Sequence, residues 1–231
     1  MANFFPDLLE RFSGAEFLKG VREKYHYGEE QTEELQRVAK EMLPLLRREA
    51  FWERQGFSSE DKPQIGNGVE ATHEKVVISL GSGIDDLQES YNEKEMLSQS
   101  YMIEVLASEV LLQSYEIYNR YVREHTETHV ARYYFPGSDE AFPIVVLPEL
   151  LSGLTDKVTC NTAFCMRPKK SVVFVSELTK DETVHCRGVC FGCNSLHCQN
   201  RMEDDSGRGR MIAKMADLPL TYGYSRILGK L

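Results

Sequence analysis

The chain has 231 residues, a formal net charge of −9 and 42% hydrophobic residues. This length supports one substantial core, or one domain with an N-terminal appendage. The acidic balance argues against a nucleic-acid partner held through its phosphates, and no apolar run approaches the roughly 20 residues of a membrane helix. The stretch MANFFPDLLERF lacks the basic start and long apolar core of a signal peptide. We therefore expect a cytoplasmic protein, in which the cysteines serve metal binding or redox chemistry rather than structural disulfides.

The segment 1–60 is predicted to be helical. Apolar residues recur at helical spacing within 4–24 and again within 29–53, where Pro44 interrupts the pattern. The stretch GFSSEDKPQIGNG, residues 56–68, is rich in turn-forming residues. It is a candidate boundary between this helical segment and a main domain.

Two strands and one long helix are predicted in the main domain. EKVVISLGSG, residues 74–83, indicates a buried strand that ends at two glycines, and KSVVFVSEL, residues 170–178, indicates a second strand. Between them, residues 94–124 show helical periodicity with a wide apolar surface, which is typical of a largely buried helix.

Glu104 lies off the polar stripe of this helix, between Ser100 and Ser108. A carboxylate near a buried face costs free energy unless it is paired or hydrogen-bonded. Two interpretations stay open. Glu104 reaches solvent or a backbone amide, or it contributes to a ligand site.

Four cysteines lie close together near the end of the chain, with the spacing C-x3-C-x2-C-x4-C: Cys186, Cys190, Cys193 and Cys198. Four thiolates close a tetrahedral zinc site or hold an iron–sulfur cluster. Zinc sites usually separate two C-x2-C pairs by a long spacer, whereas one compact run is nearer to the ferredoxin style. We favour an iron–sulfur cluster, with zinc as the alternative. A radical S-adenosylmethionine site is disfavoured, because Cys198 would close the iron that such a site leaves open.

Four stretches carry a resemblance to one known family. VVISLGSGIDDL is similar to a strand followed by a T-x-G-x-x-[VI]-D-like turn, and EMLSQSYMIEVLASEVLLQSYE to a long central helix. TDKVTCNTAFCMRPKKSVVFVSEL is similar to the segment I-x-L-T-x-S-x-x-M-x-P-x-K-S-V, and the cysteine cluster up to Arg201 to a C-x-x-C-x4-C-x-x-R ending. In this order they resemble the reactivation domain of cobalamin-dependent methionine synthase, in its short free-standing form from anaerobic bacteria.

The resemblance covers residues 70–201 and leaves 202–231 as a tail. It implies an α+β fold with a twisted antiparallel sheet and flanking helices. It also implies a function: the domain binds S-adenosylmethionine and presents its methyl group to an oxidised corrinoid, with an electron from a flavodoxin or ferredoxin. This chain has no D-x-H-x-x-G sequence. It would therefore act on the cobalamin of a separate corrinoid protein or methionine synthase.

The loop that binds S-adenosylmethionine departs from the family. The family reads R-x-x-x-G-Y, or R-x-S-P-G-Y in the short forms, whereas this chain reads RYYFPGSD at 132–139. By the resemblance, Arg132 would hold the ligand carboxylate and Gly137 would let the backbone approach the ligand. The spacing is one residue longer, and Ser138 replaces the tyrosine. The competing interpretation is a surface arginine followed by a simple turn.

Two other functions stay open. A degenerate binding module would keep the fold and the metal without S-adenosylmethionine, and the altered loop favours it. A small iron–sulfur electron-transfer protein would explain the cysteines but not the large helical remainder. The sequence identifies no catalytic residue and leaves open whether the protein is an enzyme component of methionine synthase or corrinoid methyltransferase reactivation.

Overall fold

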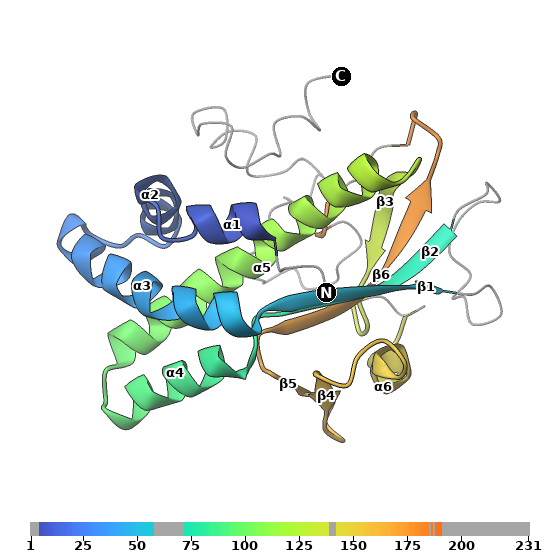
Figure 1. Cartoon of the computed structure of the whole chain (residues 1–231). Coiled ribbons are helices and arrows are strands. Elements are labelled where there is room, and N and C mark those ends of the chain that lie inside the picture. Colours follow the sequence, from blue (N-terminus) through green and yellow to red (C-terminus); the bar gives the residue numbers. More distant parts are fainter. Residues whose placement is uncertain (1–4, 58–71, 139–141, 185, 187, 191–231) are drawn as a thin grey trace. The chain divides into compact units, whose positions relative to one another are not determined.

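The structure, a computed structural model, describes residues 5–57, 72–138, 142–184, 186 and 188–190 (Figure 1). The helices are α1 (Pro6–Arg11), α2 (Ala15–Lys24), α3 (Thr32–Glu49), α4 (Ser82–Glu93), α5 (Leu97–His125) and α6 (Leu147–Leu151), with short 3-10 helices η1 (Glu29–Gln31) and η3 (Ile144–Val146). The strands are β1 (Phe51–Phe57), β2 (Thr72–Ser79), β3 (His129–Tyr134), β4 (Thr159–Cys160), β5 (Met166–Arg167) and β6 (Ser171–Thr179).

Four of these strands form one antiparallel sheet in the order β1-β2-β6-β3, and β4 pairs with β5 in a small second sheet (Figure 1). The prediction of an α+β fold with an antiparallel sheet and N-terminal helices is confirmed. Within the described residues, no helix is both long and apolar enough to cross a membrane.

The chain forms two compact units. The first comprises residues 1–53, 77–114 and 151–172, and the second comprises 54–76, 115–150 and 173–231. Helix α5 and strands β1, β2 and β6 contribute residues to both. Most of the boundary expected within 56–68, and the whole tail 202–231, lie outside the described residues.

The first unit is built around α3, which contacts α1, α2 and α4 (Figure 1). Its buried residues recur with helical period and form one apolar stripe, as in an amphipathic helix: Leu35, Val38, Ala39, Met42 and Leu46. Pro44 lies at an exposed position inside this helix, and the helix continues past it to Glu49.

The N-terminal helices differ from the sequence expectation in two places. The helix expected over 4–24 is two helices, because the chain is extended at Gly14. The helix expected over 29–53 ends at Glu49, since Ala50 is extended, with φ −68° and ψ 138°. Strand β1 begins at the next residue and buries Trp52.

Helix α4 was not expected from the sequence. It begins directly after Gly81, whose φ of 85° lies in the left-handed region that favours glycine. A Cβ at Gly81 would lie 2.4 Å from Cβ of Glu49, so no larger residue fits there. The Glu49 carboxylate accepts a hydrogen bond from the Gly83 backbone N–H (2.6 Å), which satisfies one of the free donors at the helix start.

The second unit has an aromatic core. Strand β3 pairs with β6 in antiparallel register, with an irregularity between Val130 and Arg132. Ring centroids lie 5.4 to 6.5 Å apart, within the usual range for aromatic pairs. The rings belong to Tyr115, Tyr118, Tyr133, Phe135 and Phe174.

Candidate functional site

In the first unit, three consecutive residues at the start of β6 bind to three other elements. The Lys169 backbone N–H donates to Oδ2 of Asp85 in α4 (2.7 Å). Lys170 forms an ion pair with Glu104 of α5. The Ser171 hydroxyl donates to Oγ of Ser79 in β2 (2.8 Å). We call residues 169–171 the lysine junction.

Asp85 is the most enclosed carboxylate at the lysine junction, with 8% of its surface exposed. Its Oδ2 atom accepts the Lys169 hydrogen bond, whereas its buried Oδ1 atom finds no donor within the described protein. Buried polar atoms are nearly always hydrogen-bonded in folded proteins. The Oδ1 atom is therefore a point at which a donor from a ligand would be stabilising.

Glu104 is paired rather than isolated. Its carboxylate receives hydrogen bonds from Lys170 and from Nε2 of Gln88 (3.2 Å), and its side chain is 42% exposed. Burial by itself would raise the pKa of Glu104, but the Lys170 hydrogen bond and charge, with Gln88, outweigh it and lower the pKa. Glu104 is therefore ionised at neutral pH, and part of its carboxylate faces solvent.

In the second unit, Arg132 lies on β3 opposite Glu177 of β6. Its guanidinium carbon lies 4.5 Å from the centre of the Tyr134 ring, a cation–π contact. The Tyr134 hydroxyl donates to Oε2 of Glu177 (2.7 Å). Burial, followed by the hydrogen bond and charge of Glu177, raises the pKa of Tyr134, so the phenol stays neutral. These contacts hold a half-buried arginine in a fixed position.

Gly137 lies in a tight turn that follows β3. Its φ is 83°, and a Cβ there would lie 3.2 Å from Cβ of Ile144. The Gly137 N–H donates to the Phe142 carbonyl (2.7 Å), and the Ser138 N–H donates to the Phe135 carbonyl (3.0 Å). The turn therefore requires a glycine for its own geometry, whether or not a ligand approaches it.

The cysteine cluster is described in part. Cys186 is buried, with 4% exposure, and Cys190 is half-buried. Gly188 between them has a φ of 84°, which lets the chain reverse direction. Cys193, Cys198 and Arg201 lie outside the described residues.

The start of the cysteine segment is fixed to the second unit. A ring nitrogen of His129 on β3 is hydrogen-bonded to the Val184 carbonyl (2.6 Å), and the Asp181 carboxylate accepts two hydrogen bonds from Thr183. Burial, followed by the charge of Cys190, raises the pKa of Tyr115 in the aromatic core.

No group of three or more metal-binding side chains occurs among the described residues. Cys186 and Cys190 are the two thiols of the predicted cluster that lie among the described residues, and the four-cysteine metal site stays a prediction.

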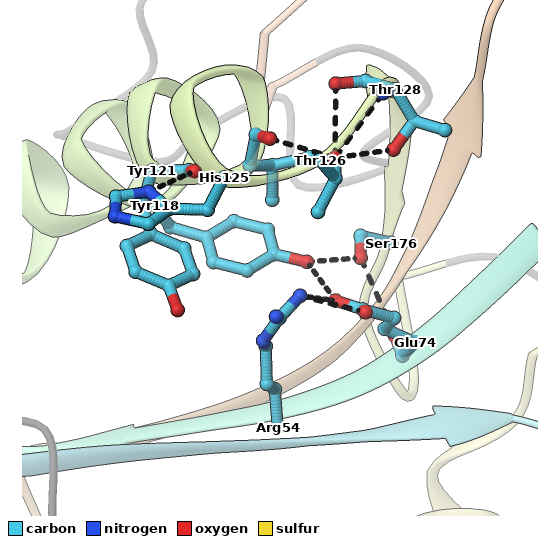
Figure 2. Close-up of polar contacts among 9 residues, drawn as sticks. Arg54, Glu74, Tyr118, Tyr121, His125, Thr126, Thr128 and Ser176 are labelled. Carbon is cyan, nitrogen blue, oxygen red and sulfur yellow. Dashed lines mark hydrogen bonds and ion pairs between the residues drawn. The ribbon is translucent and has the colours of Figure 1, made fainter.

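A partly buried ion pair was not predicted from the sequence (Figure 2). Arg54 of β1 donates to both carboxylate oxygens of Glu74 on β2, at 2.8 and 3.0 Å. The Tyr118 hydroxyl donates to Glu74 (3.1 Å) and shares a hydrogen bond of 2.6 Å with Ser176 of β6. The signal in the sequence that could have revealed this pair was the strand itself. If residues 51–57 had been predicted as a strand, Arg54 would have been expected to lie beside a residue of a neighbouring strand.

The predicted ligand residues fall in different units. Glu104 lies in the first, whereas Arg132 and Gly137 lie in the second. Asp85 and Lys170 were not predicted as site residues, although both lie in stretches that carry the family resemblance. No protein-family model matches the chain, and no curated protein matches it either.

Proposed function

We propose that this protein supports the reductive methylation of a corrinoid cofactor on a separate protein, with S-adenosylmethionine as the methyl donor. The observation that carries the proposal is the lysine junction. Asp85, Glu104 and Lys169–Ser171 come from three separate stretches that resemble the reactivation family, and they are joined by hydrogen bonds and an ion pair. If the three resemblances had arisen by chance, there would be no reason for these residues to contact one another in the fold.

Several of these groups suit an S-adenosylmethionine ligand. An ionised, half-exposed Glu104 suits an ammonium or sulfonium charge, and the free Oδ1 atom of Asp85 suits a hydrogen-bond donor. Considered separately, the Arg132 guanidinium of the second unit would, by the resemblance, bind a carboxylate. The proposed reaction adds one electron to the oxidised cobalt and transfers the methyl group from the sulfonium sulfur to it, which releases S-adenosylhomocysteine.

The cysteines would hold an iron–sulfur cluster, or zinc as the alternative. When bound, an iron–sulfur cluster would supply the route by which a flavodoxin or ferredoxin-like partner delivers the electron. The hydrogen bond between His129 and the Val184 carbonyl links the residues before Cys186 to strand β3, which supports a fixed starting point for the cysteine segment. We place this function in the cytoplasm, where a reduced thiol cluster is maintained.

Calorimetric titration with S-adenosylmethionine tests the proposal. The wild-type chain is expected to bind, and Arg132→Ala is expected to weaken binding by about 1.5–3 kcal/mol, the scale of a hydrogen bond to a charged group. Arg132→Lys is expected to restore little, because lysine cannot present a planar fork. Equal affinity of all three proteins would show that the Arg132 loop is not the site. Absence of binding to the wild type would overturn the use of S-adenosylmethionine.

A second candidate is a binding module that keeps the fold and the metal without S-adenosylmethionine. The Gly137 turn favours it, because the glycine is required by the turn itself and the family's tyrosine is replaced by Ser138. The visible spectrum of anaerobically purified protein separates the remaining cases. Brown protein, which indicates an iron–sulfur cluster, supports this module or a small electron-transfer protein if it does not bind S-adenosylmethionine. Brown protein that binds S-adenosylmethionine supports the first proposal.

A further inference from the structure

The first unit contains a pocket that belongs to none of the sites above. Its volume is about 780 Å³, within the roughly 300–1,000 Å³ typical of small-molecule sites. The apolar part of its wall comes from α1 and β1 and includes Leu9, Phe51 and Trp52. The start of α4, at Gly81 and Ser82, also lines it.

The wall carries three basic and three acidic side chains: Arg47, Arg48, Lys157, Glu10, Glu49 and Glu53. Four of them are paired with one another. Arg48 binds Glu49 at 2.6 Å, and Lys157 binds Glu53 at 2.6 Å. Lys157 also lies over the Phe51 ring, 4.6 Å from its centre. These pairs already neutralise their own charges.

Two charged side chains of the wall remain available. Arg47 at the end of α3 and Glu10 of α1 are exposed, and within the described part of the chain neither makes an ion pair or a hydrogen bond. A ligand that enters the pocket therefore meets one available cation, one available anion and an aromatic wall. A ligand of a single charge would satisfy only one of the two groups.

We propose that this pocket binds a small molecule with a free amino acid group. Its carboxylate would bind Arg47, its ammonium would bind Glu10, and its apolar body would pack against Phe51 and Trp52. The volume accommodates a free amino acid or an amino acid linked to a nucleoside. The inference does not depend on the proposed function, because Arg132, Glu104 and the cysteines do not line the pocket.

Trp52 provides a specific readout, because it lines the pocket and the chain contains one tryptophan. Titration with L-phenylalanine is expected to produce a saturable change in tryptophan fluorescence. Phenethylamine lacks the carboxylate and 3-phenylpropionate lacks the ammonium. Each is expected to bind at least about tenfold more weakly, the effect of losing one hydrogen bond to a charged group.

Matched variants locate the two contacts. Arg47→Gln and Glu10→Gln are each expected to weaken binding about tenfold or more, whereas Lys40→Gln and Glu16→Gln, on exposed positions outside the pocket, are expected to change nothing. Circular dichroism confirms that every variant is folded. S-adenosylhomocysteine distinguishes the two ligand sources: tighter binding than L-phenylalanine identifies a nucleoside-linked ligand, and equal or weaker binding identifies a free amino acid.

The inference is overturned if neither L-phenylalanine nor S-adenosylhomocysteine gives a saturable fluorescence change with folded protein. It is also overturned if phenethylamine or 3-phenylpropionate binds as tightly as L-phenylalanine. Arg132→Ala is expected to leave the Trp52 signal unchanged. A loss of S-adenosylmethionine binding in that variant would concern the proposed function alone, so the two ideas fail separately.

Discussion

The Arg54–Glu74 pair of the second unit and the Lys170–Glu104 pair of the first unit differ in how much of each carboxylate side chain is exposed. In the second unit, Arg54 and Glu74 are 29% and 18% exposed, and the carboxylate also binds the Tyr118 hydroxyl. In the first unit, Lys170 is 13% exposed but Glu104 is 42% exposed. One carboxylate is enclosed by protein, and the other is open on one side.

This difference separates a structural role from a functional one. An enclosed carboxylate is costly unless each of its lone pairs is satisfied, and once they are satisfied it fixes the elements that supply the donors. Arg54 and Tyr118 donate hydrogen bonds to the Glu74 carboxylate, and Ser176 binds the Tyr118 hydroxyl and the Glu74 backbone carbonyl, so the network links β1, β2, β6 and α5 (Figure 2). A half-open carboxylate such as Glu104 contributes less to stability but is available to a ligand.

The largest expected effect is that of Arg54→Ala. This change removes two hydrogen bonds and the cation from the partly buried Glu74 carboxylate, so the free energy of unfolding should fall by about 1.5–3 kcal/mol, the scale of a hydrogen bond to a charged group. Urea denaturation measures it. Arg54→Lys keeps the charge but not the two parallel hydrogen bonds, and is expected to fall between Ala and wild type. A loss below about 1 kcal/mol, the scale of surface pairs, would remove the contrast between the two ion pairs.

Tyr118→Phe should have the next largest effect. Tyr118 is fully buried, and loss of its hydroxyl removes hydrogen bonds to Glu74 and Ser176. We expect a loss of about 1–2 kcal/mol. The double variant with Arg54→Ala tests the network, because residues that share Glu74 should not have additive effects. Strict additivity would mean that the two side chains act independently.

Glu104→Gln should destabilise less than either change. The Lys170–Glu104 pair is half open to solvent, so we expect a loss of about 0.5–1 kcal/mol, at the level of exposed pairs. Glutamine retains the size of the side chain and a hydrogen-bond acceptor. If the proposed function is correct, this variant should lose more in ligand affinity than in stability, and calorimetry with urea denaturation compares the two. The reverse order would assign Glu104 a structural role.

The pH dependence gives the smallest effect. The pKa of Glu104 is lowered in the folded protein. Its contribution to stability is therefore complete above the ordinary carboxyl pKa of about 4.3 and is lost as the pH falls through the lower folded value. The difference in unfolding free energy between wild type and Glu104→Gln should shrink across this acidic range. A constant difference at all pH values would show that Lys170 does not stabilise the charged form.

Helix α5 and the apolar strand β6 were accessible to sequence reasoning because their signals are local. Residues 94–124 repeat apolar side chains with the period of a helix, and α5 spans Leu97–His125. The β-branched run at 170–178 predicts a strand, and β6 spans Ser171–Thr179. In both cases neighbouring residues in the chain carry the pattern, so no distant contact is needed to recognise it.

The sites depended on contacts that no local pattern contains. Glu104 and Lys170 are 66 residues apart, and Asp85 and Lys169 are 84 apart, so only the packing of α4, α5 and β6 brings them together. The first residues of β1, 51–53, were included in the predicted helix because β1 lacks a clear alternation. They form a strand because β2 supplies the hydrogen bonds. The sequence by itself determined which segments are apolar and where thiols, carboxylates and basic groups occur. Tertiary structure decided which of these charges are neutralised and which remain exposed, because the free energy of a charge depends on its surroundings.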